Sequence, residues 1–253
     1  MNKILALGAA LFVFASATLH SAPPQTSAPA PSAQSSPLLT AAEELLGQVS
    51  PENSAYKHQA PDVHWSTDPS APARCNTDCS GLLIALFERY DPKRFDGDAF
   101  KRWLDARRPT ARRFYDAIEA EKGFRRIAKI SDAQPGDLIT MKYQPGEEST
   151  GHAMLIAEKP QRAEKPTPTL VDGTEQWLVT VLDQSKSGHG ATDTRRTGAG
   201  SYRGGLGKGV FRVYAKPDGT LAGYTWSTFG NSKFYGDEDR VLAIGRFDAG
   251  FKP

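Results

Sequence analysis

The sequence predicts an α+β fold in which helices come first and a largely antiparallel sheet follows. Before Gly123 the apolar residues recur at helical spacing, and after it they fall in short β-type runs. Strands and helices do not alternate as they would around a parallel sheet. With 253 residues, 39% of them hydrophobic, the chain can bury a core, which excludes disorder throughout.

The N-terminus has the three parts of a secretory signal peptide. Lys3 is positively charged, residues 4–14 are apolar, and Ala15-Ser16-Ala17 offers a small-x-small cleavage pattern. As a helix the apolar run would rise only about 16 Å, roughly half of a hydrocarbon core. We therefore expect residues 1–17 to be removed and the mature protein to be secreted or periplasmic, without stable membrane insertion.

Residues 18–37 are rich in Pro, Ser and Ala. The segment from Ser21 to Pro37 carries no charge and has little apolar surface to bury, which predicts a disordered tether with polyproline character. No second stretch of this kind interrupts the remainder. We expect residues 38–253 to form a single domain.

Four helices are predicted ahead of the strands. Thr40-Ala41-Ala42-Glu43 reads as a capping box that opens the first helix. A proline-rich stretch that we expect to be irregular separates it from the second, which Pro92 ends. Gly123 lies just past the fourth. The second, third and fourth helices are predicted over 79–90, 98–106 and 110–122.

Six strands are predicted after Gly123. Each is a short run rich in β-branched, aromatic or other apolar residues, bounded by Gly, Pro or polar residues. The sequence Pro217-Asp218-Gly219 is typical of a tight turn and predicts a hairpin. The expected strands are 138–143, 152–157, 177–183, 210–214, 221–226 and 241–247.

Composition excludes several classes of function. The chain has 31 Lys+Arg against 29 Asp+Glu, a formal net charge of +2, which lacks the basic excess of a dedicated nucleic-acid binder. Two cysteines are too few for a disulfide scaffold or a four-thiolate zinc site. Any role of the cysteines is therefore local and chemical.

Cys79 stands in the first turn of a predicted helix. Unpaired backbone N–H groups and the positive end of the helix dipole favour a thiolate there, and the same N–H groups can hold an oxyanion. Alone, a cysteine in this place is more often a small packing residue. His58, His64, His152 and His189 are the histidines that could serve as its base.

His152 opens a predicted strand directly after a turn-rich loop, and the next predicted strand ends at Asp183. A carboxylate in that place can hold a histidine base in the correct tautomer. Cys79, His152 and Asp183 thus follow in the order of nucleophile, base and orienting acid.

These motifs resemble those of the NlpC/P60 superfamily of papain-like cysteine peptidases. The likeness rests on Asp78-Cys79-Ser80-Gly81 before an apolar helix, Pro135-Gly136-Asp137-Leu138 opening a strand and Gly151-His152 opening the next. It covers about Tyr56 to Asp183, roughly half of the chain. The resemblance implies a papain-like fold with Cys79 as nucleophile, His152 as base and Asp183 as third polar residue, Gln184 being the alternative. It also implies cleavage of peptide bonds in peptidoglycan stem peptides, which suits a secreted protein.

The substrate-binding candidates lie around these motifs. Tyr56-Lys57-His58 is the nearest match to the tyrosine and glycine segment that usually precedes the nucleophile of the family. His189 and Arg195 stand in a segment that either faces the substrate or forms a solvated connection, and Arg would pair with an acidic stem peptide. The candidates are Tyr56, His58, Ser80, His189 and Arg195.

The glycine-rich segment 204–209 superficially resembles a phosphate loop, but it lacks the GxxxxGK[ST] pattern and precedes a strand. We therefore expect no nucleotide and no cofactor. Cys75 either forms a disulfide with Cys79 or packs in the core. A zinc site would recruit both cysteines with His58 and His64, but CxxxC is not the common knuckle spacing, so we expect no metal.

Two functions of different class remain. The first is a secreted cysteine hydrolase that acts on peptidoglycan or another peptide substrate through an acyl-enzyme. The second is a non-catalytic wall-binding or structural module on the same fold, because a fold alone does not determine function.

Overall fold

The computed structural model describes residues 36–253, except 69 and 199. The predicted signal peptide and nearly all of the predicted tether lie outside the described residues. The contacts join the described residues into one unit, which mixes helices with a mostly antiparallel sheet. The helices of the described part are α1 (Pro37–Gln48), α2 (Cys79–Tyr90), α3 (Gly97–Leu104) and α4 (Ala111–Glu119).

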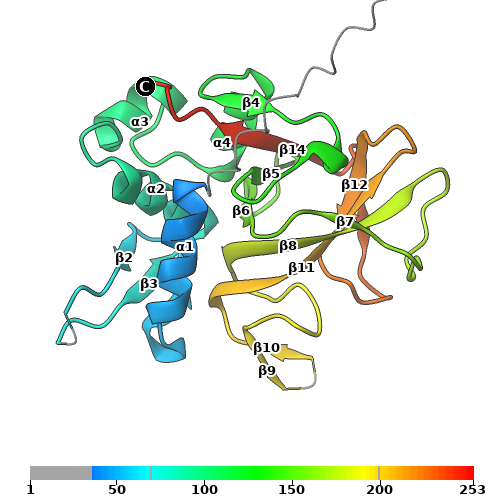
Figure 1. Ribbon diagram of the computed structural model, residues 1–253, viewed down its shortest axis with the longest axis horizontal. Coiled ribbons are helices and arrows are strands. Elements are labelled where there is room, and N and C mark those ends of the chain that lie inside the picture. The colour runs from blue at the N-terminus through cyan, green and yellow to red at the C-terminus, as the bar shows by residue number, and fades with distance from the viewer. Residues whose placement is uncertain (1–35, 69, 199) are drawn as a thin grey trace, which may run out of the picture. The chain divides into compact units, whose positions relative to one another are not determined.

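The main sheet has nine strands, and every pairing within it is antiparallel. Its order is β13-β12-β11-β8-β6-β5-β14-β4, with β7 paired to β8 off this path. Figure 1 shows the long strands β8 and β11 running side by side. The strands are β4 (Phe124–Arg126), β5 (Leu138–Tyr143), β6 (Gly151–Ile156), β7 (Gln161–Arg162), β8 (Glu175–Ser185), β11 (Gly205–Ala215), β12 (Leu221–Thr225), β13 (Phe234–Tyr235) and β14 (Arg240–Phe247).

Two small sheets complete the fold. In the first, β1 (Ser54–Tyr56) pairs in parallel with β3 (Arg74–Thr77), which also pairs antiparallel with β2 (Asp62–His64). The second consists of β9 (Arg196–Gly198) and β10 (Ser201–Tyr202). The α+β prediction is confirmed, as are the helix 79–90 and the strand 138–143. The hairpin at Pro217-Asp218-Gly219 is also confirmed, since it joins β11 to β12.

The capping-box prediction is wrong. The first helix begins at Pro37, and Thr40 lies inside its first turn, where its hydroxyl donates to the carbonyl oxygen of Ser36. Proline is well suited to the first helical position because its fixed φ matches the helix and its missing N–H would be unpaired there. The third helix begins one residue earlier than expected, after Asp96, whose side chain accepts a hydrogen bond from the amide of Ala99.

The stretch expected to be irregular contains β1, β2 and β3. These strands are only three or four residues long, which is too short for an alternating pattern to show among prolines. Their placement matters for the site, because β3 leads directly into Cys79 at the start of α2.

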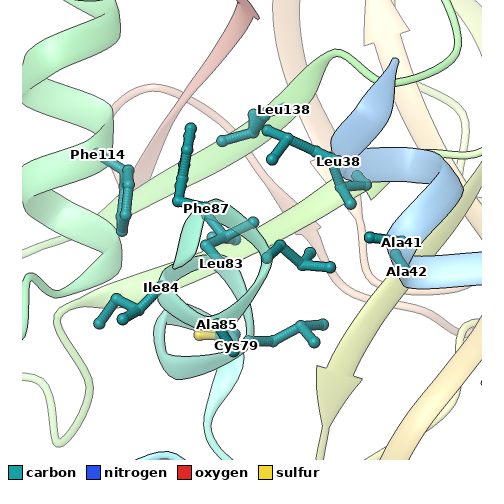
Figure 2. Close-up of a cluster of buried hydrophobic side chains, with 14 of the residues drawn as sticks. Leu38, Ala41, Ala42, Cys79, Leu83, Ile84, Ala85, Phe87, Phe114 and Leu138 are labelled. Atoms are coloured by element: carbon teal, nitrogen blue, oxygen red, sulfur yellow. The ribbon is translucent and has the colours of Figure 1, made fainter. Parts of the chain in front are cut away.

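An apolar cluster packs against each of the two faces of the main sheet. One lies under the helices and includes Leu38 and Phe87; the other contains Met154, Val181 and Phe211. Figure 2 shows side chains of α1 and α4 on either side of α2, with Cys79 at the end of the same cluster. No helix of the described part is long and apolar enough to cross a membrane.

Phe87 is fully buried at the centre of the helix-side cluster. Its ring contacts six aromatic neighbours: Phe95, Phe100, Trp103, Phe114, Phe124 and Phe247. We predict that Phe87→Ala lowers the free energy of unfolding by about 3–5 kcal/mol, because the site cannot collapse around the lost ring. Phe229→Ala, at a ring that is 37% exposed, should cost less than about 1 kcal/mol. Chemical denaturation of both variants tests this, and equal losses would contradict it.

Candidate active site

Cys79 is the first residue of α2, and Asp78 caps that helix. The Asp78 carboxylate accepts hydrogen bonds from the Gly81 amide at 2.8 Å and from the Ser80 hydroxyl at 2.9 Å. This cap fixes the turn in which the Cys79 side chain, 5% exposed, stands beside a cleft. The first amides of a helix lack partners inside the helix, so they are available to an oxyanion next to the sulfur.

His152 and Asp183 form a buried hydrogen-bonded pair. Nε2 of His152 lies 2.6 Å from Oδ2 of Asp183. His152 is the second residue of β6, and Asp183 lies near the end of β8, two paired strands. Because Nε2 is engaged by the carboxylate, Nδ1 is the ring nitrogen left to exchange a proton with Cys79.

The charge state of His152 follows from its neighbours. Burial of the ring disfavours its charged form, but a Cys79 thiolate and hydrogen bonds to Asp183 and Cys79 outweigh burial and raise the pKa of His152 to about 10. Burial disfavours the charged form of Asp183 as well, which for a carboxylate raises the pKa. The charges of Arg195 and His189, together with the hydrogen bonds from His152 and His189, outweigh burial and hold the pKa of Asp183 well below its usual range. Asp183 is therefore a fixed carboxylate.

Gln184, the alternative third residue, faces away from His152. Its Nε2 donates to the carbonyl oxygens of Ala55 at 2.8 Å and Cys75 at 3.1 Å, while its Oε1 accepts from the Cys75 thiol at 3.5 Å. Successive residues of a strand point to opposite faces, so Asp183 and Gln184 cannot both contact the base. Gln184 ties β8 to β1 and β3 and so anchors the strand that leads into Cys79.

Cys75 does not pair with Cys79: both thiols are free in the structure. Cys75 lies on β3, is fully buried, and burial raises the pKa of its thiol to about 12. Its environment is that of a packing residue. Within the described residues, no group of three or more His, Cys, Asp or Glu side chains could hold a metal ion.

His189 and Arg195 are fully buried behind Asp183, so they do not face the cleft as a substrate-binding loop would. Nε2 of His189 lies 3.1 Å from Oδ2 of Asp183. Nη1 of Arg195 lies 2.8 Å from Oδ1 of Asp183, an ion pair that lacks the alignment of a hydrogen bond. Arg195 also forms a bidentate ion pair with the Asp193 carboxylate. Oδ2 of Asp193 accepts a further hydrogen bond from the backbone amide of His189. Of the segment expected to face the substrate or to be solvated, His189, Asp193 and Arg195 are buried, whereas residues 186–187, 191–192 and 196–198 are exposed.

The glycine-rich segment 204–209 makes room for this network. Gly207 lies opposite Asp183 in the β8–β11 register. A Cβ atom on Gly207 would lie 2.4 Å from Nε of Arg195, and one on Gly209 would lie 2.2 Å from Oδ2 of Asp193. Both glycines therefore allow the two charged side chains to lie flat against β11.

The cleft beside Cys79 consists of two hollows that meet at Tyr56 and His58. The hollow on the Cys79 side has a volume of about 150 Å³, and the one on the His152 side about 320 Å³. The first is lined by Tyr56, His58, Asp78, Cys79, Ser80, Thr110, Ala111, Glu148, Ser149, Thr150 and Gly151. The second is lined by Tyr56, His58, Tyr143, Glu148, Ser149, Gly151, His152, Ser185, Lys186, Ser187 and Trp226.

Three of the predicted substrate-binding residues, Tyr56, His58 and Ser80, line this cleft. Burial, then the charges of a Cys79 thiolate and Asp78, raise the pKa of Tyr56, which keeps its hydroxyl protonated and able to donate toward Cys79. His58 is largely exposed, with Nδ1 3.5 Å from the Asp78 carboxylate.

Sequence reasoning missed Trp226, Tyr143 and Glu148. The Trp226 ring meets the His152 ring edge-on at 4.8 Å between centroids and covers one side of it. No sequence signal marks it, because it follows a strand that is distant along the chain from both Cys79 and His152. Glu148 lies on the turn-rich loop before Gly151, which the sequence does show as a loop. Larger hollows of about 870 and 550 Å³ near Arg125 and Arg246 contain no cysteine or histidine.

Comparisons with known proteins find a relative encoded by a virus. No protein-family model matches the chain, and no solved structure matches it. The uncharacterized protein R653 of Acanthamoeba polyphaga mimivirus is 32% identical over 215 residues, which are 81% of this chain and 93% of the viral protein. The chain belongs to the same family as this viral protein.

The coupling between Cys79 and His152 gives a prediction about pH. We predict that the His152 ring keeps its proton through neutral pH and loses it near pH 10 in the wild type. In Cys79→Ala the pKa of His152 should fall, because the thiolate charge that holds the proton is gone. NMR titration of labelled histidine measures both values. An unchanged His152 titration in Cys79→Ala would show that the sulfur is not its partner.

Proposed function

We propose that this protein is a cysteine hydrolase of the NlpC/P60 type that cleaves an amide bond in a peptidoglycan stem peptide. The observation that carries the proposal is the convergence of Cys79, from a helix tip, and His152, from a strand, on one cleft, with Asp183 of the next strand hydrogen-bonded behind His152. The order of the three residues along the chain and the α+β fold agree with that family.

The cleft supports acyl-enzyme chemistry. The Cys79 thiolate attacks the carbonyl carbon, and the resulting oxyanion is held by amides at the start of α2 and by the Tyr56 hydroxyl. His152, protonated, gives its proton to the leaving amine as the C–N bond breaks. His152 then takes a proton from water, which attacks the thioester, and the carboxylic acid and the Cys79 thiolate are released.

Trp226 and Tyr56 define how a substrate can enter. Both line the 320 Å³ hollow, so the chain of the substrate passes between two aromatic side chains on its way to His152. The hollow on the Cys79 side, at about 150 Å³, is the smaller of the two. This asymmetry favours a small residue on one side of the cleaved bond and a bulkier or extended one on the other.

The decisive experiment is incubation of the protein with purified peptidoglycan, followed by mass analysis of the released fragments. We expect fragments with newly formed amino and carboxyl ends inside the stem peptide. Binding to peptidoglycan without any release, by wild type under reducing conditions, would favour the non-catalytic wall-binding alternative.

We predict that Cys79→Ala abolishes release while the fold persists, because the Cys79 thiolate is the group that forms the acyl bond in the proposed reaction. Cys75→Ser should retain activity, since its hydroxyl can still donate to Gln184. Circular dichroism and fragment release compare the two. Preferential labelling of Cys75 by an active-site alkylating reagent would contradict this assignment.

We also predict that His152→Ala is nearly as damaging as Cys79→Ala, whereas Asp183→Asn costs less, because an orienting residue contributes less than the base it orients. The measurement is kcat/KM on a released-fragment assay. A larger loss in Asp183→Asn than in His152→Ala would show that the carboxylate itself takes part in proton transfer.

A further inference from the structure

Both ring nitrogens of His189 face groups that only accept hydrogen bonds. Nδ1 lies 2.8 Å from the backbone carbonyl oxygen of Trp226, and Nε2 lies 3.1 Å from Oδ2 of Asp183. A neutral imidazole carries one N–H, so either neutral tautomer would set a lone pair against an acceptor at one end. Only the doubly protonated ring satisfies both contacts.

From these contacts we infer that His189 is a protonated positioning residue that holds Asp183 in place for His152. Nε2 of His189 donates to Oδ2 of Asp183, the same oxygen that contacts His152. Nδ1 of His189 donates to the backbone carbonyl oxygen of Trp226. This inference rests on the proposed function, in which His152 is the base of Cys79. His189 itself is fully buried and does not reach the cleft.

The charges around His189 balance only if it is positive. The groups that face it or its carboxylate partner are Asp183 from β8, His152 from β6, and Asp193 and Arg195 from the segment after β8. Asp183, Asp193 and the Cys79 thiolate beside His152 are negative, whereas Arg195 and the protonated His152 are positive, so a neutral His189 would leave one negative charge uncompensated. Buried charges are strongly disfavoured unless they are paired.

His189 also bears on the Cys79 and His152 pair electrostatically. A positive charge on His189, behind Asp183, weakens the negative potential that the Asp183 carboxylate produces at Cys79. The thiolate form of Cys79 is therefore favoured over the thiol. Removing that charge while keeping a hydrogen-bond donor should therefore move the formation of the reactive thiolate to higher pH. Gln is the conservative replacement, because its amide can donate to Asp183 but carries no charge.

The direct test is NMR of the full chain labelled with 15N on histidine, with His189→Gln used to assign the His189 signals. We expect both ring nitrogens of His189 to show protonated chemical shifts from pH 6 to pH 8, with ring protons that exchange slowly. A His189 nitrogen with the shift of an unprotonated imidazole at pH 7 would overturn the inference. This readout needs neither substrate nor turnover.

The functional test is the pH dependence of Cys79 alkylation by iodoacetamide, located by mass analysis. In His189→Gln the pH midpoint of alkylation should rise by about one unit, so that the rate below the midpoint falls about tenfold. His64→Gln, on β2 and outside the network, should leave the midpoint unchanged. A midpoint in His189→Gln equal to that of the wild type would overturn the positioning role.

The two tests separate the inference from the function on which it rests. If wild-type Cys79 is alkylated no faster than Cys75, the nucleophile assignment fails, whatever the NMR of His189 shows. If Cys79 is reactive but the His189 ring is neutral at pH 7, the proposed function survives and the inference about His189 fails.

Discussion

The structure around the cleft depends on one buried carboxylate. Asp183 is fully inside the protein, and one of its oxygens is shared by His152 at 2.6 Å and His189 at 3.1 Å while Arg195 neutralises the other. A charge in that position is tolerated only if cations and hydrogen bonds surround it. The segment that follows β8 supplies those cations, and its path back across β11 is what brings His189 and Arg195 behind the strand.

This requirement explains features that look unrelated in the sequence. The glycines at 207 and 209 are needed because Arg195 and Asp193 lie where their Cβ atoms would be. Gln184, one residue beyond Asp183, points to the opposite face of β8 and binds the backbone of β1 and β3. One strand thus holds His152 through Asp183 on one face and the strands that lead to Cys79 through Gln184 on the other.

The sequence predicted the parts of this arrangement that have local signals. The helix that begins at Cys79 has a regular apolar period and an aspartate cap, and the strands of Met141 and Met154 are apolar runs bounded by turns. The three strands before Cys79 were not predictable, because each is too short for a period and is held by pairing partners distant in sequence. Burial of His189 was hidden for a different reason: polar letters between glycines usually mark a surface loop.

The chemistry of the cleft follows from a division of labour between its two sides. On the helical side, Cys79 of α2 and Tyr56 of β1 would contact the carbonyl group of a substrate. Residues of the sheet side, His152 and Trp226, would meet the leaving group. The sheet side is held in place by the contacts of His152 Nε2 and of both ring nitrogens of His189, whereas the cleft is bounded by the exposed loop that carries Glu148. Under the proposed function, this arrangement keeps the proton-transfer geometry of His152 constant and leaves the exposed loop as the part of the cleft that can differ. Variation in substrate among proteins of this family should therefore arise in that loop and spare the carboxylate network behind it.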